Sequence, residues 1–144
     1  MMFKINIRDK ALNQLSNYIN KTHEQIGLLI GKFENGELYI NEVINGTGEA
    51  DKSHCMFSQD LLAEVADNII NGRLEGSIVG WCHSHIHGGI FMSSIDIETQ
   101  CKLQQFSQYI VSIVVDVSSR QFGIFIYDQQ SGPIQIPSEY ISIS

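Results

Sequence analysis

Apolar residues along the chain alternate or run together in stretches that predict β-strands. Residues 3–7 alternate apolar and polar side chains, which predicts a first strand with one buried face. Residues 25–33 are mostly apolar, as is typical of a strand buried on both faces. The Asn35-Gly36 pair that follows is a strong signal for a tight turn, so we expect residues 37–44 to return as the second arm of a hairpin.

The second half of the chain contains further strand patterns. Residues 77–82 alternate and lead into a segment rich in histidine. Residues 109–117 are rich in β-branched side chains and predict an interior strand, and residues 121–127 alternate again. A Gly-Pro pair at 132–133 predicts a loop, after which residues 134–136 are expected to form a short last strand.

Apolar residues at helical spacing predict three helices between these strands. We expect them at residues 9–22, capped by Asp9, at residues 58–71, capped by Ser58, and at residues 94–106. The apolar face expected for the second helix comprises Leu61, Leu62, Val65, Ala66, Ile69 and Ile70. Intermixed helices and strands with a hairpin indicate an α/β (α+β) fold, a mixed sheet flanked by helices, in a single domain over residues 1–144.

Composition and charge narrow the class of protein. The chain is 43% hydrophobic and 17% charged, and its net charge of −7 without a basic run argues against nucleic-acid binding. No apolar run approaches the roughly 20 residues that span a bilayer, and the N-terminus lacks an apolar signal core, so we expect a cytoplasmic protein. Three widely spaced cysteines without a CxxC pair are expected to be buried free thiols.

One Gly- and His-rich segment contains most of the residues that are candidates for metal binding. His83 and His85 stand two residues apart at the end of a predicted strand, so their rings are expected to point to the same side. Asp96 falls in the first turn of the next predicted helix, which Ser93 or Ser94 can cap. Two imidazoles and one carboxylate leave a fourth position open, as is expected of a catalytic zinc rather than a structural one.

A zinc site of this kind needs a general base, because the water that it activates must lose a proton during attack. The best candidate is Glu24, which stands at the mouth of the apolar strand at residues 25–33. Sequence spacing alone does not establish that its carboxylate reaches the histidines. The Ser93 hydroxyl is a candidate donor to the oxyanion of a tetrahedral intermediate. Together these groups describe metal-assisted hydrolysis of an amide.

Two separated motifs resemble those of the JAMM (MPN-plus, JAB) zinc metalloproteases. His83-Ser84-His85, seven residues, and then Ser93-Ser94-Ile95-Asp96 is similar to the family pattern of His-Ser/Thr-His-Pro, six residues, Ser, two residues and Asp. Residues 24–31 (E-Q-I-G-L-L-I-G) resemble its upstream Glu-x-x-Gly-x-Leu-x-Gly. The order of elements resembles the family from about residue 3 to 127.

The resemblance implies a fold, a cofactor and residue roles. The implied fold is a curved mixed β-sheet packed between helices, similar to the cytidine deaminases. One catalytic zinc is implied, with His83, His85 and Asp96 as its ligands. Glu24 carries over as the general acid/base and Ser93 as the oxyanion donor.

The family also implies a substrate class. Its members cut isopeptide or peptide bonds at the C-terminus of ubiquitin or ubiquitin-like proteins, so the resemblance implies a deubiquitinase-like hydrolase acting after the terminal Gly of such a protein. Compact archaeal and bacterial relatives suggest an alternative, a hydrolase that processes a small sulfur-carrier protein or a peptide. A catalytically silent MPN interaction module is a third reading, and the full set of motif residues argues against it. The oligomeric state is not predicted, and both homo- and hetero-oligomers are compatible with the sequence.

Two residues beside the predicted ligands complicate the match to the family pattern. Ile86 stands where the family usually has Pro, which would stiffen the loop after the second ligand. His87 offers a third imidazole that could compete with Asp96, although a mobile rim near the substrate is the preferred interpretation. Cys101 is the only Cys or His after Asp96, so the second zinc site of the endosomal deubiquitinase branch is not expected.

Overall fold

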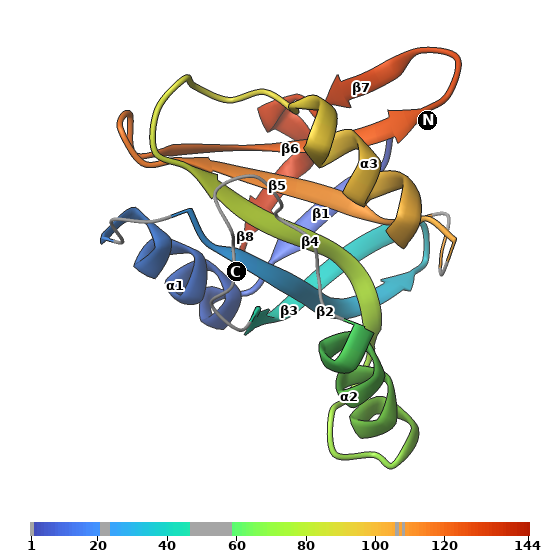
Figure 1. Cartoon of the computed structure of the whole chain (residues 1–144). Coiled ribbons are helices and arrows are strands. Elements are labelled where there is room, and N and C mark those ends of the chain that lie inside the picture. The colour runs from blue at the N-terminus through green and yellow to red at the C-terminus, as the bar shows by residue number, and fades with distance from the viewer. Residues whose placement is uncertain (1, 21–23, 47–58, 106, 108) are drawn as a thin grey trace.

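The computed structural model describes residues 2–20, 24–46, 59–105, 107 and 109–144 (Figure 1). Its elements in chain order are β1 (Lys4–Ile7), α1 (Asp9–Ser16), the 3₁₀ helix η1 (Asn17–Asn20), β2 (Ile26–Glu34), β3 (Glu37–Asn45), α2 (Gln59–Ile70), β4 (Ser77–His85), α3 (Ser94–Leu103), β5 (Val111–Asp116), β6 (Gln121–Asp128), β7 (Gly132–Gln135), the 3₁₀ helix η2 (Ser138–Tyr140) and β8 (Ile141–Ile143). No helix in these ranges is long and apolar enough to cross a membrane.

The strands form one curled, mixed sheet in the order β7-β6-β5-β4-β2-β3-β1-β8. The pairs β4–β5, β1–β3 and β1–β8 are parallel, and the others are antiparallel. Strong curvature is evident because the rings of Phe3 and Tyr109 meet edge to face at 6.3 Å, although three strands separate β1 from β5 in the sheet. The predicted curved mixed sheet is therefore confirmed.

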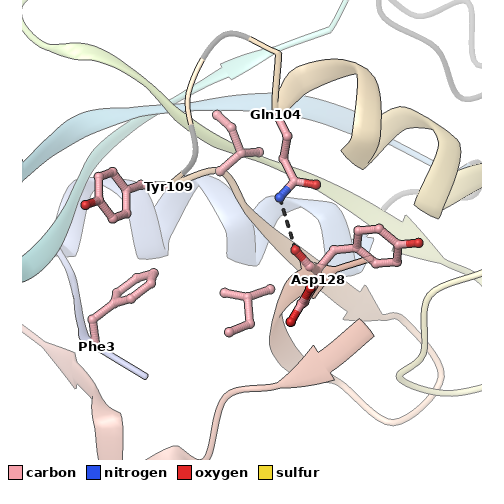
Figure 2. Close-up of a pocket in the computed structure, with 7 residues that line it drawn as sticks. Phe3, Gln104, Tyr109 and Asp128 are labelled. Atoms are coloured by element: carbon pink, nitrogen blue, oxygen red, sulfur yellow. Dashed lines mark hydrogen bonds between the residues drawn. The ribbon is translucent and has the colours of Figure 1, made fainter. Parts of the chain in front are cut away.

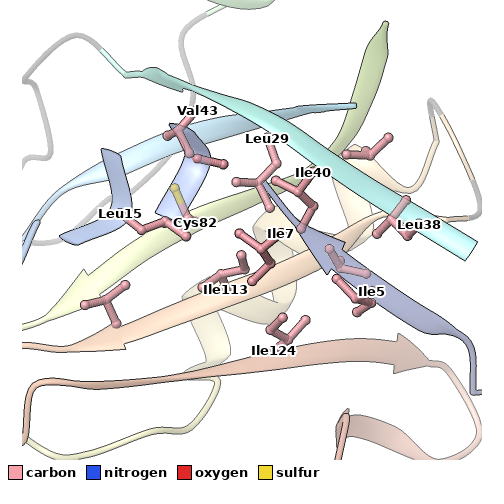
Figure 3. Packing of buried hydrophobic residues seen from close by; sticks show 14 of the residues in the cluster. Ile5, Ile7, Leu15, Leu29, Leu38, Ile40, Val43, Cys82, Ile113 and Ile124 are labelled. Atoms are coloured by element: carbon pink, nitrogen blue, oxygen red, sulfur yellow. The ribbon is translucent and has the colours of Figure 1, made fainter. Parts of the chain in front are cut away.

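Each face of the sheet carries its own apolar core. One core packs Ala11 and Leu15 of α1 against residues such as Ile7 and Ile113 (Figure 3). The other packs α2 and the end of α3 against the opposite face, around the fully buried Trp81. These two cores explain why β2 is apolar on both sides, as its sequence predicted.

Two glycines of the upstream motif allow close packing around β2. A side chain at Gly27 would overlap the Tyr18 hydroxyl, and one at Gly31 would overlap the carbonyl oxygen of Tyr39 in β3. Gly31 lies where the β2–β3 register shifts by a bulge, so the neighbouring backbone comes unusually near. The motif glycines thus have a packing role that does not depend on catalysis.

Several predicted boundaries were wrong. Asp9 is the first residue of α1 rather than its cap, and the α-helix ends at Ser16, after which η1 continues to Asn20. The third helix ends at Leu103. The Gly-Pro pair at 132–133 belongs to β7 rather than to a loop.

The remaining corrections concern α2 and the C-terminal strand. Ala66 and Ile70 were assigned to the apolar face of α2, but both are exposed, Ile70 by 82%. Residues 134–136 are not the last strand, because β8 follows and pairs with β1. The expected cap at Ser58 and the first of the three cysteines, Cys55, lie outside the described residues.

Candidate metal centre

The end of β4 presents two histidines on one face of the sheet. His83 and His85 alternate with Cys82 and Ser84, as the strand period requires. Cys82 points into the α1-side core, and burial raises the pKa of its thiol to about 12. The thiol is therefore protonated and faces away from the histidines, as the sequence predicted.

Asp96 reaches the same place from the first turn of α3. Ser93 caps this helix: its Oγ accepts from the Asp96 N–H at 3.2 Å, and its own N–H donates to Asp96 Oδ2 at 2.9 Å. This reciprocal capping box fixes both the start of the helix and the direction of the carboxylate. The predicted cap at Ser93 is confirmed.

The three side chains converge on one point. Asp96 Oδ2 lies 3.0 Å from His83 Nε2 and 3.1 Å from His85 Nε2. One ligand atom from each residue lies within 4.8 Å of the others, and all three residues are buried. Strand period and helix cap together therefore assemble the two-imidazole, one-carboxylate group that the sequence indicated.

The hydrogen bonding of the rings fits a metal ion. His85 Nδ1 lies 3.3 Å from the Gly89 carbonyl oxygen, so donation from Nδ1 leaves the Nε2 lone pair facing Asp96. Neither ring nitrogen of His83 has a hydrogen-bond partner among the described residues, since its 3.0 Å contact with Asp96 has poor geometry for a hydrogen bond. A buried, unpartnered Nε2 aimed at a carboxylate is satisfied by a metal ion between them.

Electrostatics favour the metal-binding protonation states of His83 and Asp96, whereas the pKa of His85 shifts the other way. Burial lowers the pKa of His83 below the ordinary histidine value. Burial also acts to lower the pKa of His85, but the interactions with Asp96 and the Gly89 carbonyl outweigh it and the pKa is raised. Burial acts to raise the pKa of Asp96, yet the close contacts of its carboxylate with both imidazoles hold that pKa far below its usual range. Neutral His83 and ionised Asp96 are the ligand forms of these groups.

Glu24 is brought to the site by the pairing of β2 with β4. The register places Ile26 opposite His83 and continues outward to Gln25, whose N–H donates to Ser84 Oγ at 2.7 Å and whose carbonyl accepts from the Ser84 N–H at 3.0 Å. Glu24 is exposed at the end of this ladder, and its negative charge is a minor influence that opposes the lowering of the His83 pKa and adds to the raising of the His85 pKa. The pairing thus places the backbone next to Glu24 beside the end of β4, and the role of its carboxylate stays a prediction.

Other residues beside the site were missed or undecided in the sequence. Ser84 stands at the Ser/Thr position of the family pattern, but the sequence did not show that it ties β4 to the residue after Glu24. His87 is exposed and outside the three-residue group, so the described structure does not support it as a competing ligand. Ile86 is half-buried at the same turn.

Two hollows in the described structure lie elsewhere. One, of about 170 Å³, lies between the end of α3 and β6, where Gln104 Nε2 donates to the Tyr127 carbonyl at 3.1 Å (Figure 2). The other, of about 390 Å³, lies between α2 and the start of β4, beside Ile69 and Ile78. Neither is lined by a residue of the candidate metal centre.

Comparisons with known proteins agree with this geometry. A family model described as "JAB1/Mov34/MPN/PAD-1 ubiquitin protease" matches residues 2–109. COP9 signalosome complex subunit 5 of Dictyostelium discoideum is 34% identical over 133 residues, which cover 83% of this chain and 40% of that protein. AMSH-like ubiquitin thioesterase 2 of Arabidopsis thaliana is 33% identical over 107 residues, which cover 73% of this chain and 46% of that protein.

The extent of these matches differs between sequences and structures. The chain spans less than half the length of either curated relative. The solution structure of protein DSY2949 from Desulfitobacterium hafniense matches 97% of this chain and 92% of its own, with a TM-score of 0.68 and 17% identity. That likeness concerns the fold alone.

Proposed function

This chain belongs to the JAB1/Mov34/MPN/PAD-1 ubiquitin protease family, and from this premise we propose that it is a zinc-dependent isopeptidase or peptidase acting after the C-terminal Gly of ubiquitin or a ubiquitin-like protein. The observation that carries the proposal is the convergence of His83, His85 and Asp96 at a buried point beside Glu24. The description of the family as a ubiquitin protease and a relative named as a ubiquitin thioesterase support the substrate class.

The donor set suits zinc, which binds two imidazole nitrogens and a carboxylate oxygen with a fourth position open. When bound, zinc supplies Lewis-acid chemistry, which polarises a carbonyl and makes water acidic enough to attack near neutral pH. His83, His85 and Asp96 would hold it. Their burial keeps these groups in a low-dielectric environment, where electrostatic effects on the substrate are strong.

Glu24 is proposed to move the proton. Its carboxylate stands at the exposed mouth of the site, where it can accept a proton from water and return it to the leaving amine. The Gln25–Ser84 hydrogen bonds fix the backbone that carries it. A general acid/base held on a paired strand end, rather than on a free loop, keeps a constant position relative to the ligands.

Ser93 is proposed to stabilise the oxyanion. Its Oγ accepts from the Asp96 N–H, which leaves the hydroxyl proton available for donation to a substrate oxygen. Capping and oxyanion stabilisation are therefore compatible in one side chain.

Replacement of Ser93 by Ala is expected to lower kcat by about 100- to 1,000-fold with little change in KM, because the lost donor acts mainly in the transition state. Steady-state kinetics on metal-loaded protein measures both constants. Ser94→Ala, at an exposed neighbouring hydroxyl, is the matched control and should behave as wild type. A change in KM alone would assign Ser93 to capping or substrate contact.

The substrate class is tested by a panel of isopeptide- and peptide-linked proteins. We expect cleavage of ubiquitin dimers of one or more linkages, because the matching family model is described as a ubiquitin protease and one relative is named a ubiquitin thioesterase. Cleavage restricted to conjugates of small Gly-Gly-tailed carrier proteins would instead support the alternative function, the processing of a small sulfur-carrier protein. Metal-loaded protein that cleaves neither would contradict the proposed activity and favour the silent interaction module.

A further inference from the structure

His83 lacks the support that usually orients a metal ligand. Metal-binding histidines almost always donate their second ring N–H to a carbonyl, a carboxylate or water, and His85 does so to Gly89. His83 Nδ1 has no such partner among the described residues, although the side chain is 1% exposed. Another contact must therefore set the direction in which His83 Nε2 points.

That contact is the indole of Trp81. The two rings stack with their centroids 4.4 Å apart and their planes 15° from parallel. Trp81 lies two residues before His83 on the same face of β4, so strand geometry brings the rings together. A rotation of the indole would change the surface on which the imidazole rests.

The indole in turn is held by Gln100. Trp81 Nε1 donates to Gln100 Oε1 at 2.7 Å, and Gln100 Nε2 donates to the Ile110 carbonyl at 2.8 Å. Both side chains are fully buried. Gln100 lies four residues after Asp96 on α3, so the helix that carries the carboxylate ligand also carries this amide.

We propose that Gln100 is a positioning residue for the metal centre: its amide fixes the Trp81 ring, and the ring holds His83 in the orientation that aims Nε2 at Asp96. The inference rests on the metal site of the proposed function. It adds a connection in which α3 supplies one ligand directly and orients a second through the indole.

A purely structural role for Gln100 predicts a different result. A glutamine that served only stability would lower the melting temperature when replaced, and folded protein would bind zinc as before. A positioning residue changes metal affinity in folded protein. The two roles are therefore separated by a binding measurement that does not use the hydrolytic activity.

The test measures zinc affinity by competition with a chromogenic chelator, together with the visible spectrum of the Co²⁺-substituted protein. Gln100→Met, which keeps the side-chain length and removes both hydrogen bonds, is expected to weaken zinc binding by about 10- to 100-fold and to alter the Co²⁺ spectrum. Gln104→Met is the matched control. Gln104, at the end of α3, also donates its side-chain amide to a carbonyl, that of Tyr127, but this hydrogen bond does not involve Trp81. The control should keep wild-type zinc affinity.

A double-mutant cycle assigns the effect to the indole. Trp81→Phe keeps an aromatic ring but has no N–H for Gln100 to hold, so it should also weaken zinc binding, and adding Gln100→Met should cost little more. Trp81→Phe by itself tests the connection if Gln100→Met does not fold. Folded variants with wild-type zinc affinity would overturn the inference and leave the proposed function intact. Zinc-loaded wild type that cleaves no substrate would contradict the proposed function and leave this inference intact.

Discussion

Glu24→Gln protein is expected to bind zinc as wild type does and to hydrolyse its substrate roughly 100- to 10,000-fold more slowly, the range that a positioned general acid/base contributes. Glutamine has nearly the same shape as glutamate but cannot take up a proton. Because Glu24 lies outside the His83–His85–Asp96 group, its replacement should leave the ligands unchanged. Single-turnover kinetics with matched metal content measures the effect.

The matched control is Glu34→Gln at the opposite end of β2. Glu34 is also an exposed carboxylate, and it pairs with Lys32 at 2.8 Å, far along the strand from the metal centre. This variant should keep normal turnover, since surface ion pairs contribute little. Near-normal turnover in Glu24→Gln itself would remove Glu24 from the mechanism.

The ligand group could be predicted from the sequence because two local rules place it. A strand period of two puts His83 and His85 on one face, and a helix cap at Ser93 puts Asp96 in the first turn of α3. Both rules act over a few residues and do not depend on the rest of the fold. These rules do not by themselves show that the end of β4 and the start of α3 lie close together.

Contacts between distant segments could not be derived in the same way. The backbone next to Glu24 lies beside the end of β4 only because β2 pairs with β4, and a single sequence does not state which strands are neighbours. The hydrogen bond from Trp81 to Gln100 joins residues 19 apart, and no local spacing rule links them. Such contacts follow from the curvature and order of the whole sheet.

Two of the errors in the fold lie at the sheet edges. A Gly-Pro pair usually marks a loop, but β7 is an edge strand, where a proline removes no ladder hydrogen bond that the sheet requires. β8 is three residues long, with a pattern too short to identify, and it is stabilised by its pairing with β1. Local signals at these positions were overridden by strand pairing, with the adjacent β6 for β7 and with the distant β1 for β8.

Replacing both His83 and His85 by Ala is expected to abolish zinc binding and, with it, hydrolysis. Asp96 would remain as the one protein ligand of the group, and a single carboxylate does not retain zinc. The control is His87→Ala, at an exposed imidazole outside the group, which should keep both metal and activity. Loss of zinc in the control would restore His87 as a ligand.

The central claim, that His83, His85 and Asp96 form the metal centre, is tested most directly by the zinc content of purified protein. Elemental analysis of wild type and of the His83→Ala/His85→Ala variant, prepared side by side, gives this number. We predict about one zinc per wild-type chain, as for a single catalytic site, and almost none in the variant. A fully loaded double variant would contradict the assignment.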